Sequence, residues 1–229
     1  MTQQAADTGL IEELRGQADR YHSAHPFHVR MNDGELSPAQ IRGWVANRFA
    51  YQDAIPHKDA AILANCPDRA VRRRWIRRIT DHDGTDGTEG GIEAWLRLGE
   101  AVGLARDEVE DFRHVVPGVR FAVDAYVTFA RTRPWVEAVA SSLTELFAPN
   151  LMGERLAAFE KYYTWIDPEG LAYFRNRLFQ APRDSDHALE VVTEHCRTRE
   201  QQAAAVDALA FKNDVLWSMM DAIEKAYPA

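Results

Sequence analysis

The chain has 229 residues, and 35 acidic against 27 basic side chains give it a formal net charge of −8. This acidic balance excludes binding to nucleic acid or an anionic membrane through bulk positive charge, although it leaves room for a local basic pocket. The two cysteines, Cys66 and Cys196, support no disulfide framework or zinc spacing, and no signal peptide or membrane-spanning stretch is visible. We therefore expect a cytoplasmic protein.

The first half of the chain has the pattern of helices separated by clear stop signals. Serine and proline at 37 and 38 are an N-cap and a first-turn proline, and helical apolar spacing follows them. Pro56 is expected to interrupt this helix, with a further helix at 58–64. Another helix is predicted to begin at 66–68 and to run towards residue 82. The glycine-rich segment between Asp83 and Gly91 contains no apolar residue and predicts a loop.

The second half continues the helical pattern. Proline and aspartate mark several helix starts, and apolar residues recur at three- and four-residue spacing after them. No run of alternating apolar and polar residues predicts a strand. The expected helices lie at 91–102, from 117, from 134, from 167, from 184 and at 199–226. Residues 1–229 should therefore form one all-α domain, a compact bundle of about seven helices.

Several polar residues fall on helix faces that should be buried. Residues four apart in a helix share one face, and three such polar pairs occur among apolar neighbours. The pairs are Arg48 with Gln52, Arg78 with His82, and Tyr173 with Arg177, while Glu145 and Lys212 each interrupt an apolar stretch. Each one alone has an ordinary explanation, because a long cationic side chain usually reaches solvent and a buried tyrosine usually belongs to the core.

Together, these polar residues predict a binding site for an anion. Burying several cations is costly unless anions compensate them. Glu145 is one internal candidate, and a ligand with several carboxylates would supply the remaining negative charge. Arginine suits this task because its planar guanidinium matches a carboxylate with two hydrogen bonds.

A metal site is the main alternative in a helical bundle. Di-iron bundles use a repeated Glu-x-x-His pattern, which this sequence lacks. The other candidates are the segment 81–83, the segment 184–187 with Glu194 and His195, and the triplet His22, His25 and His28, whose helical alignment Pro26 makes doubtful. The glycine-rich loop lacks the GK[ST] ending of a phosphate-binding loop. We expect neither a metal site nor a nucleotide site.

Long segments of the sequence resemble the pyrroloquinoline-quinone synthase family. They include YHSAHPFH, WVANRFAYQDAIPHKDAAILANCPD, ITDHDGTDGTEGGIEAWLRLGEAVGL, PGVRFAVDAY, SSLTELFAP and FKNDVLWSMMDA. The resemblance implies a heme-oxygenase-like, TenA-like bundle that forms a homodimer. It also implies the final step of pyrroloquinoline quinone biosynthesis, in which O2 drives ring closure and eight-electron oxidation of a bicyclic polycarboxylate precursor and H2O2 is released. No metal or organic cofactor is implied, and the product would pass to a pathway of quinone-dependent dehydrogenases.

The resemblance also implies roles for individual residues. His82 matches the proton-transfer histidine, whose imidazole titrates near neutral pH. Tyr173 and Arg177 match residues that position and activate oxygen. The substrate contacts match Tyr21, His22, Arg48, Tyr51, Gln52, Lys58, Arg78, Tyr126, Thr144, Glu145, Arg155 and Lys212.

One position departs from the family pattern. Met152 stands where the family has a histidine, and methionine can neither carry a proton nor donate a hydrogen bond. The protein could be a fully active oxidase, an oxidase that is slow in its later steps, or a quinone-binding paralogue that acts as a carrier. A TenA-like hydrolase or a di-iron oxygenase on the same bundle are further alternatives, but neither Cys66 nor Cys196 lies in a distinctive context for the hydrolase.

Overall fold

The computed structural model describes residues 3–228, and this part of the chain is almost entirely helical. The expected all-α class is confirmed, although the described residues form eleven α-helices and not about seven. The α-helices are α1 (Gln3–Arg15), α2 (Pro26–Asp33), α3 (Pro38–Asn65), α4 (Arg69–Asp83), α5 (Gly91–Ala101), α6 (Arg106–Glu110), α7 (Pro117–Thr132), α8 (Trp135–Ala140), α9 (Ala148–Tyr162), α10 (Ala172–His195) and α11 (Arg199–Ala226). The 3₁₀ helices are η1 (Ala18–Arg20), η2 (His22–Ala24), η3 (Ser141–Leu146) and η4 (Pro168–Leu171).

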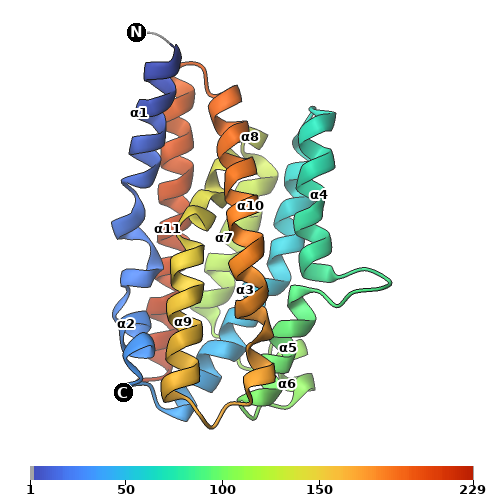
Figure 1. Cartoon of the computed structure of the whole chain (residues 1–229), viewed down its shortest axis with the longest axis vertical. Helices are drawn as coiled ribbons and strands as arrows, with labels where there is room; N and C mark the ends of the chain where they lie inside the picture. Colours follow the sequence, from blue (N-terminus) through green and yellow to red (C-terminus); the bar gives the residue numbers. More distant parts are fainter. Residues whose placement is uncertain (1–2, 229) are drawn as a thin grey trace.

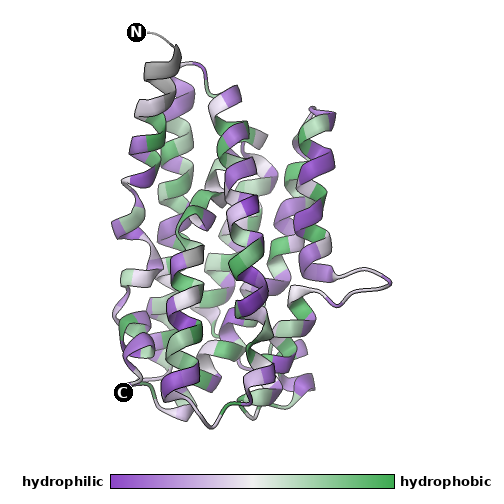
Figure 2. Ribbon diagram, viewed as in Figure 1, coloured by the Kyte–Doolittle hydropathy of each residue, from purple (hydrophilic) through white to green (hydrophobic). Residues whose placement is uncertain are grey.

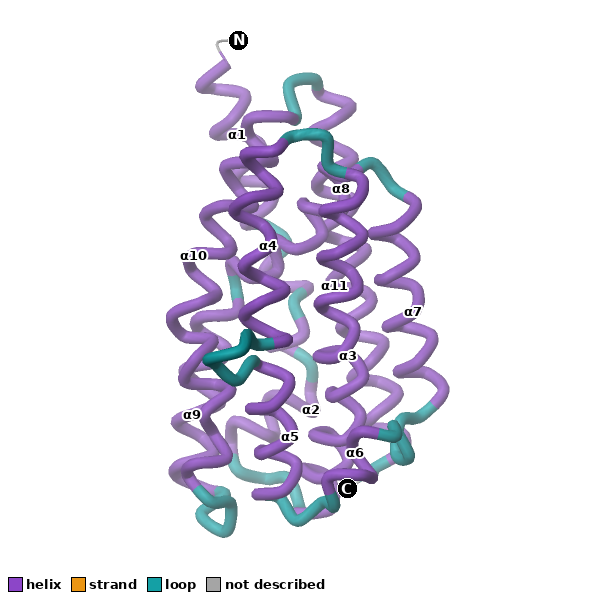
Figure 3. Tube along the Cα trace, turned by 90° about the vertical axis from the view of Figure 1, so that its right-hand side faces the viewer, coloured by secondary structure: helices purple, strands orange, loops and turns teal. Residues whose placement is uncertain are grey.

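The longest helices run side by side along the long axis of the molecule (Figure 1). Helix α3 packs against α4, α5 and α7, while α10 packs against α9 and η3, and α11 packs against α7 and η3. Short loops connect the helices (Figure 3). Apart from an isolated bridge between Thr85 and Thr88, the described residues contain no β-structure. Helix η3 therefore lies where α10 and α11 can both contact it.

Side-chain caps fix the beginnings of the longest helices. The hydroxyl of Ser37 accepts a hydrogen bond from the backbone of Gln40, whose side chain accepts one from the backbone of Ser37 in return. Thr198 and Gln201 form the same reciprocal cap on α11. The Asp68 carboxylate accepts from two backbone N–H groups at the start of α4. Each cap satisfies backbone donors that a helix leaves free, and the predicted helix starts at these positions are confirmed.

Two predicted interruptions are wrong. Helix α3 continues through Pro56, and α10 passes without a break through residues 184–186. An internal proline costs roughly 3 kcal/mol, because it leaves the carbonyl four residues earlier without a donor. Burying one large apolar side chain contributes about 1.5–3 kcal/mol, and α3 buries several, including Trp44, Phe49 and Ile62. Packing along the whole helix therefore outweighs the local break.

The predicted helix from Pro134 changes its type along its length. It is α-helical over Trp135–Ala140 and then tightens into the 3₁₀ helix Ser141–Leu146. The predicted starts at 117 and 167 agree with α7 and η4, and the final helix has the expected bounds. Among the described residues, no helix is long and apolar enough to cross a membrane. Hydrophilic and hydrophobic residues are mixed along the helices (Figure 2).

The predicted loop between α4 and α5 is confirmed and projects from the side of the bundle (Figure 1). Gly84 has a φ of 84°, a backbone conformation that glycine adopts readily. Gly90 lies so close to the end of α4 that an added Cβ would come within 2.1 Å of the His82 carbonyl oxygen and 2.4 Å of the Gly84 nitrogen. The return of the loop thus determines where the backbone of His82 lies.

Replacing Gly90 by alanine is expected to destabilise the protein by about 1–3 kcal/mol, the usual cost of forcing extra atoms into a packed site. The backbone near His82 must move to admit the methyl group. Urea unfolding would measure the change. Gly87→Ala is the matched control in the same loop, because no atom lies within 4 Å of its added Cβ. Equal stability of the two variants would contradict this account of the loop.

Two apolar clusters form the core, one toward each end of the bundle. One cluster, called the upper cluster, includes Leu14, Ile62, Trp75, Val192 and Leu209, and the other, called the lower cluster, includes Trp44, Phe49, Trp95, Phe174 and Leu216. Several helices contribute to both clusters and carry polar side chains between the two sets of apolar residues. We call these side chains the polar layer: Arg48, Gln52, Lys58 and Asp59 on α3, Arg78 and His82 on α4, Glu145 on η3, Arg177 and Asp184 on α10, and Lys212 on α11.

Candidate functional site

The polar layer brings together most of the polar residues that the sequence singles out. Their burial rules out the explanation that each cation reaches solvent, since Arg48 is 8% exposed, Arg155 2% and Lys212 0%. Tyr51 and Glu145 are partly buried, and the other predicted site residues are buried. The predicted residues outside the polar layer are Tyr21 and His22 near the amino terminus, Tyr51 on α3, Tyr126 on α7, Thr144 on η3, Arg155 on α9 and Tyr173 on α10.

Part of the polar layer is internally neutralised. Glu145 lies between two guanidinium groups, 2.9 Å from Arg78 and 2.8 Å from Arg177. Arg177 also contacts Asp184 at 3.4 Å. Burial raises the pKa of Glu145, and the two arginines oppose that shift. The expectation that Glu145 compensates buried cations is therefore confirmed.

The charge of Lys58 is likewise neutralised by a neighbouring carboxylate. Its ammonium donates to the Asp59 carboxylate at 2.6 Å and to the Ser142 hydroxyl at 3.0 Å. The indole N–H of Trp75 donates to the same carboxylate oxygen at 2.8 Å. The guanidinium of Arg78 stacks over the Trp75 ring, 4.1 Å from its centroid. Asp59 and Trp75 thus hold two of the predicted cations in place.

Three buried cations have no carboxylate partner among the described residues. Arg48 and Lys212 lie 3.9 and 4.1 Å from the centroid of the Tyr51 ring. The Lys212 ammonium also lies 3.2 Å from the Tyr126 ring centroid, and Arg155 stacks over Trp44 at 4.8 Å. Aromatic faces attract cations but cannot replace a counter-ion. This group, Arg48, Arg155 and Lys212, is the unpaired cation cluster.

Burial and repulsion from neighbouring cations disfavour the charged forms of Arg155 and Lys212. Burial lowers the pKa of Lys212 well below its usual value, and Arg48 and Lys58 lower it further. Burial, with Arg48, lowers the pKa of Arg155 to about 9. A bound anion would reverse both shifts, since an opposite charge favours the protonated form. The cluster is therefore suited to hold a ligand with several carboxylates.

His22 and His28 adjoin this cluster. Their ring centroids are 4.6 Å apart, and His28 Nδ1 donates to the His22 carbonyl oxygen at 2.7 Å. Burial lowers the pKa of both imidazoles, and Arg48 and Arg155 contribute in each case. The Tyr21 ring lies 4.4 Å from that of His22, and burial raises the Tyr21 pKa to about 12. Both rings are therefore uncharged polar groups at neutral pH.

His82 has the geometry of a proton acceptor. Its Nδ1 lies 2.9 Å from the Arg78 carbonyl oxygen, which can only accept, so the proton is assigned to Nδ1. Its Nε2 is buried and has no hydrogen-bond partner among the described residues. Burial, followed by the positive charge of Arg177, lowers the pKa of His82 to about 4. The imidazole is neutral at pH 7, and its free lone pair can take a proton.

The predicted oxygen-handling pair, Tyr173 and Arg177, lies near this histidine: Tyr173 and His82 both border Gly91, and Arg177 acts on the His82 pKa. Tyr173 Oη donates to Gln52 Oε1 at 2.8 Å, and burial raises the pKa of Tyr173 so that it keeps its proton. Arg177 follows four residues later on the same face of α10. Met152 is 8% exposed and packs in the lower cluster, which also contains Tyr173.

The metal alternatives gain no support from the described residues, which contain no group of three histidine, cysteine, aspartate or glutamate side chains arranged to hold an ion. His25 caps α2 by accepting from the Phe27 N–H, and its other nitrogen lies 3.0 Å from Asp221. Both of its ring nitrogens are thus engaged with groups other than His22. Both cysteines are buried and free.

Sequence reasoning missed the residues that support the cations. Asp59 gives no separate signal beside Lys58, and the helix start predicted at 184 says nothing of the contacts that the Asp184 carboxylate makes with Arg177 and Arg183. The spacing of Trp75 three residues before Arg78 places both on one face of α4. That spacing was the available signal for the stacking.

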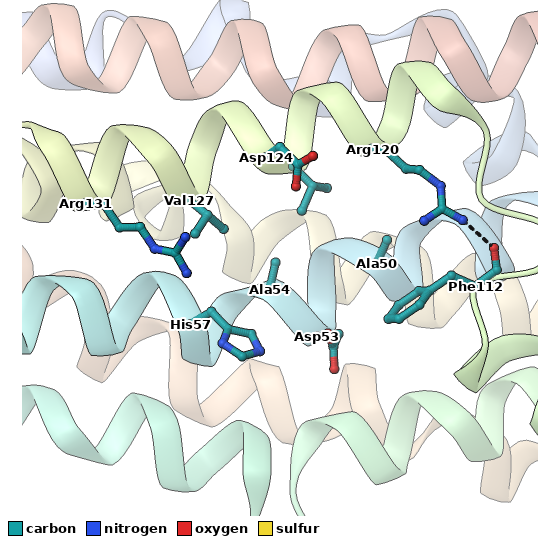
Figure 4. Close-up of a pocket in the computed structure, with 10 residues that line it drawn as sticks. Ala50, Asp53, Ala54, His57, Phe112, Arg120, Asp124, Val127 and Arg131 are labelled. Atoms are coloured by element: carbon teal, nitrogen blue, oxygen red, sulfur yellow. Dashed lines mark hydrogen bonds between the residues drawn. The ribbon is translucent and has the colours of Figure 1, made fainter.

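A groove of about 350 Å³ lies between α3 and α7, away from this chemistry. Asp53 and His57 line it from α3, and Asp124 and Arg131 line it from α7 (Figure 4). None of the predicted site residues lines this groove. The candidate site therefore rests on the buried, incompletely paired charges and not on this groove.

Comparisons with known proteins agree with the fold and with the family resemblance. The family model described as the TENA/THI-4/PQQC family matches residues 11–222. A pyrroloquinoline-quinone synthase of Pseudomonas aeruginosa is 59% identical over 228 residues, which cover 99% of this chain and 91% of the relative. The enzyme of the same name from Cronobacter sakazakii is 58% identical over 214 residues, 93% of this chain and 85% of the relative.

Two solved structures share the fold at low sequence identity. A domain with a heme oxygenase-like fold from Shewanella denitrificans has a TM-score of 0.78 at 15% identity and covers 96% of this chain and 92% of its own. A TenA homolog from Pseudomonas syringae pv. tomato has a TM-score of 0.74 at 17% identity, with 95% and 92% coverage. The expected heme-oxygenase-like fold is confirmed.

Proposed function

The chain belongs to the TENA/THI-4/PQQC family, and from that premise we propose that it is a pyrroloquinoline-quinone synthase, the enzyme of the final step of pyrroloquinoline quinone biosynthesis. The carrying observation is the unpaired cation cluster. Three buried cations without carboxylate partners are costly to the free protein, and a polycarboxylate ligand would compensate them. The relatives carry the name of an enzyme whose product is such a quinone.

In this proposal, the unpaired cation cluster binds the carboxylates of the precursor. Arg48 and Lys212 hold one end of the ligand against Tyr51, while Arg155 and His22 hold another. The remaining predicted contacts complete the wall of the site. The paired arginines stay fixed by Glu145 when the ligand is absent, so they need little reorganisation on binding.

His82 is proposed to remove protons from the bound precursor during ring closure and oxidation. Its free Nε2 supplies the lone pair, and a bound carboxylate would raise its pKa from about 4 towards working pH. Tyr173 and Arg177 are proposed to stabilise the negative charge that develops on oxygen as it accepts electrons from the precursor. Molecular oxygen is the electron acceptor, and peroxide takes up the released protons.

A homodimer remains the expected assembly and is proposed from the family resemblance alone. Sedimentation at micromolar concentration measures it directly, and a single species at the 26.0 kDa mass of the chain would contradict it.

An oxygen pulse tests the activity. The protein is mixed anaerobically with the biosynthetic precursor, and air-saturated buffer is then added. Appearance of the quinone spectrum together with peroxide is the expected result. Tight binding without oxidation would reject the oxidase and leave the second candidate, a quinone carrier, which the methionine at position 152 favours because that side chain cannot carry protons.

Replacing Met152 by histidine is expected to raise the rate of the oxidative steps several-fold, since it adds a proton-carrying group to the apolar cluster that also contains Tyr173. Single-turnover kinetics after the oxygen pulse would measure it. Met152→Gln is the control, because it adds polarity without a group that titrates near neutral pH. An unchanged rate in Met152→His would show that this departure from the family pattern does not limit the reaction.

A further inference from the structure

Asp59 carries a buried carboxylate oxygen that nothing in the described structure uses. The side chain is 0% exposed and lies on α3 within the polar layer. Its Oδ1 accepts from both the Lys58 ammonium and the Trp75 indole, at 2.6 and 2.8 Å. Its Oδ2 is buried and has no hydrogen-bond partner among the described residues. An acceptor left in this state is unfavourable, so a donor is expected to reach it.

The free oxygen is held in a fixed direction. Two donors fix Oδ1, and the rotation of the carboxylate is thereby restricted. The Trp75 ring is itself held, because Arg78 stacks over it at 4.1 Å and the His187 ring lies 5.7 Å away. Such support from neighbouring side chains is typical of groups that contact a ligand, since it reduces the entropy lost on binding.

Asp59 lies near enough to His82 and Lys212 to influence both groups electrostatically. Its negative charge raises the pKa of His82 and of Lys212, although burial is the larger influence on both. His82 Nε2 is a second acceptor without a partner in the described structure. Among the described residues, the layer therefore contains donors without a hydrogen-bond partner at Arg48 and Lys212, and acceptors without one at Asp59 and His82.

We propose that Asp59 Oδ2 accepts a hydrogen bond from an N–H or O–H group of the ligand. The site then selects polycarboxylates that also carry a hydrogen-bond donor on their ring. The carboxylates of the ligand would face the unpaired cation cluster and its ring donor would face Asp59, so the ligand would bind in one orientation. This inference rests on the proposed function for the identity of the ligand. Trp75 is a positioning residue, because it acts through Asp59 and Arg78.

The test is anaerobic calorimetric titration with the biosynthetic precursor, which requires binding but no turnover. In Asp59→Asn, the amide NH2 stands either at the position of Oδ2, where it cannot accept from the ligand, or at the position of Oδ1, where it faces the donors of Lys58 and Trp75. In either orientation, a tenfold or greater loss of affinity for the precursor is expected. Asp53→Asn is the matched control on the same helix, since Asp53 lines the outer groove (Figure 4), and its affinity should stay within twofold of the parent.

A double variant separates contact with the ligand from support of Lys58. In a Lys58→Met background, Asp59→Asn is still expected to weaken binding about tenfold. Loss of that effect, or an unchanged affinity in the single variant, would overturn the proposal. The titration needs no oxidation. Failure of the oxygen pulse would therefore reject the enzyme activity and leave the measured role of Asp59 in binding unchanged.

The unaltered protein provides a second measurement should the variants fold poorly. Two rigid dicarboxylates of the same shape, pyrrole-2,5-dicarboxylate and furan-2,5-dicarboxylate, differ in a ring N–H against a ring oxygen. Each competes with the precursor in titrations of the unaltered protein. A tenfold preference for the pyrrole is expected, and equal competition or no competition by either compound would overturn the role assigned to Asp59.

Discussion

Replacing Lys212 by methionine should stabilise the ligand-free protein and weaken binding of the quinone product by about a hundredfold. Lys212 is fully buried in the unpaired cation cluster, and burial lowers its pKa far below that of the unfolded chain. Below the unfolded pKa, the unfolded chain binds the proton more readily, so this lysine opposes folding at pH 7. An apolar side chain of similar length removes that cost, roughly 2 kcal/mol.

Binding changes in the opposite direction because a carboxylate of the ligand loses its partner. Truncating one member of a buried charge pair costs about 2–5 kcal/mol. Thermal unfolding with and without product measures both effects: the variant should melt higher without ligand, and the parent higher with it. Lys225→Met, at an exposed position on the same helix, is the control. A variant that melts lower than the parent in both conditions would show that Lys212 has a structural partner.

Replacing His82 by asparagine should lower the rate of oxidation by about 10²–10⁴-fold while leaving precursor affinity within a few-fold. The asparagine amide can keep the hydrogen bond that Nδ1 donates to the Arg78 carbonyl, but it offers nothing at the position of Nε2. Single-turnover kinetics and anaerobic titration separate the two quantities. An equal loss of rate and affinity would assign His82 to binding alone.

The same variant should change how stability depends on pH. The His82 pKa is about 4 in the folded protein against about 6.5 in an unfolded chain. The unfolded state therefore binds more protons as the pH falls from 6.5 towards 4, and folding stability decreases over that window. His82 alone accounts for about 2 kcal/mol between pH 7 and pH 5. Urea unfolding at both pH values should show this difference reduced by that amount in His82→Asn.

The sequence predicted the helical class, most helix starts and most of the polar layer because these follow from local spacing. Arg48, Gln52 and Lys212 stood out as polar residues among apolar neighbours. The continuity of α3 through Pro56 was not predictable, because packing of the whole helix decides it. The ion pair between Asp184 and Arg177 likewise could not be predicted, because it requires α10 to continue through residue 184.

Family resemblance named the ligand contacts, but it did not distinguish the cations that are already paired from those that are free. Arg78 and Arg177 share Glu145, whereas Arg48 and Lys212 have no carboxylate partner in the part of the chain that the structure describes. That difference arises from distances between helices far apart in the sequence. It decides which substitutions should stabilise the free protein and which should destabilise it.

The division of the core into two clusters has a mechanical consequence. Helices α3, α10 and α11 contribute side chains to both clusters and cross the polar layer between them. Pro56 and Pro182 lie within α3 and α10 near the polar layer, and each removes one backbone hydrogen bond from its helix. Bending is thus easiest at the level of the polar layer, where the precursor is proposed to bind. The two apolar clusters can remain rigid while the helices bend between them. A bound polyanion would contact several helices at that level and would restrict the bending.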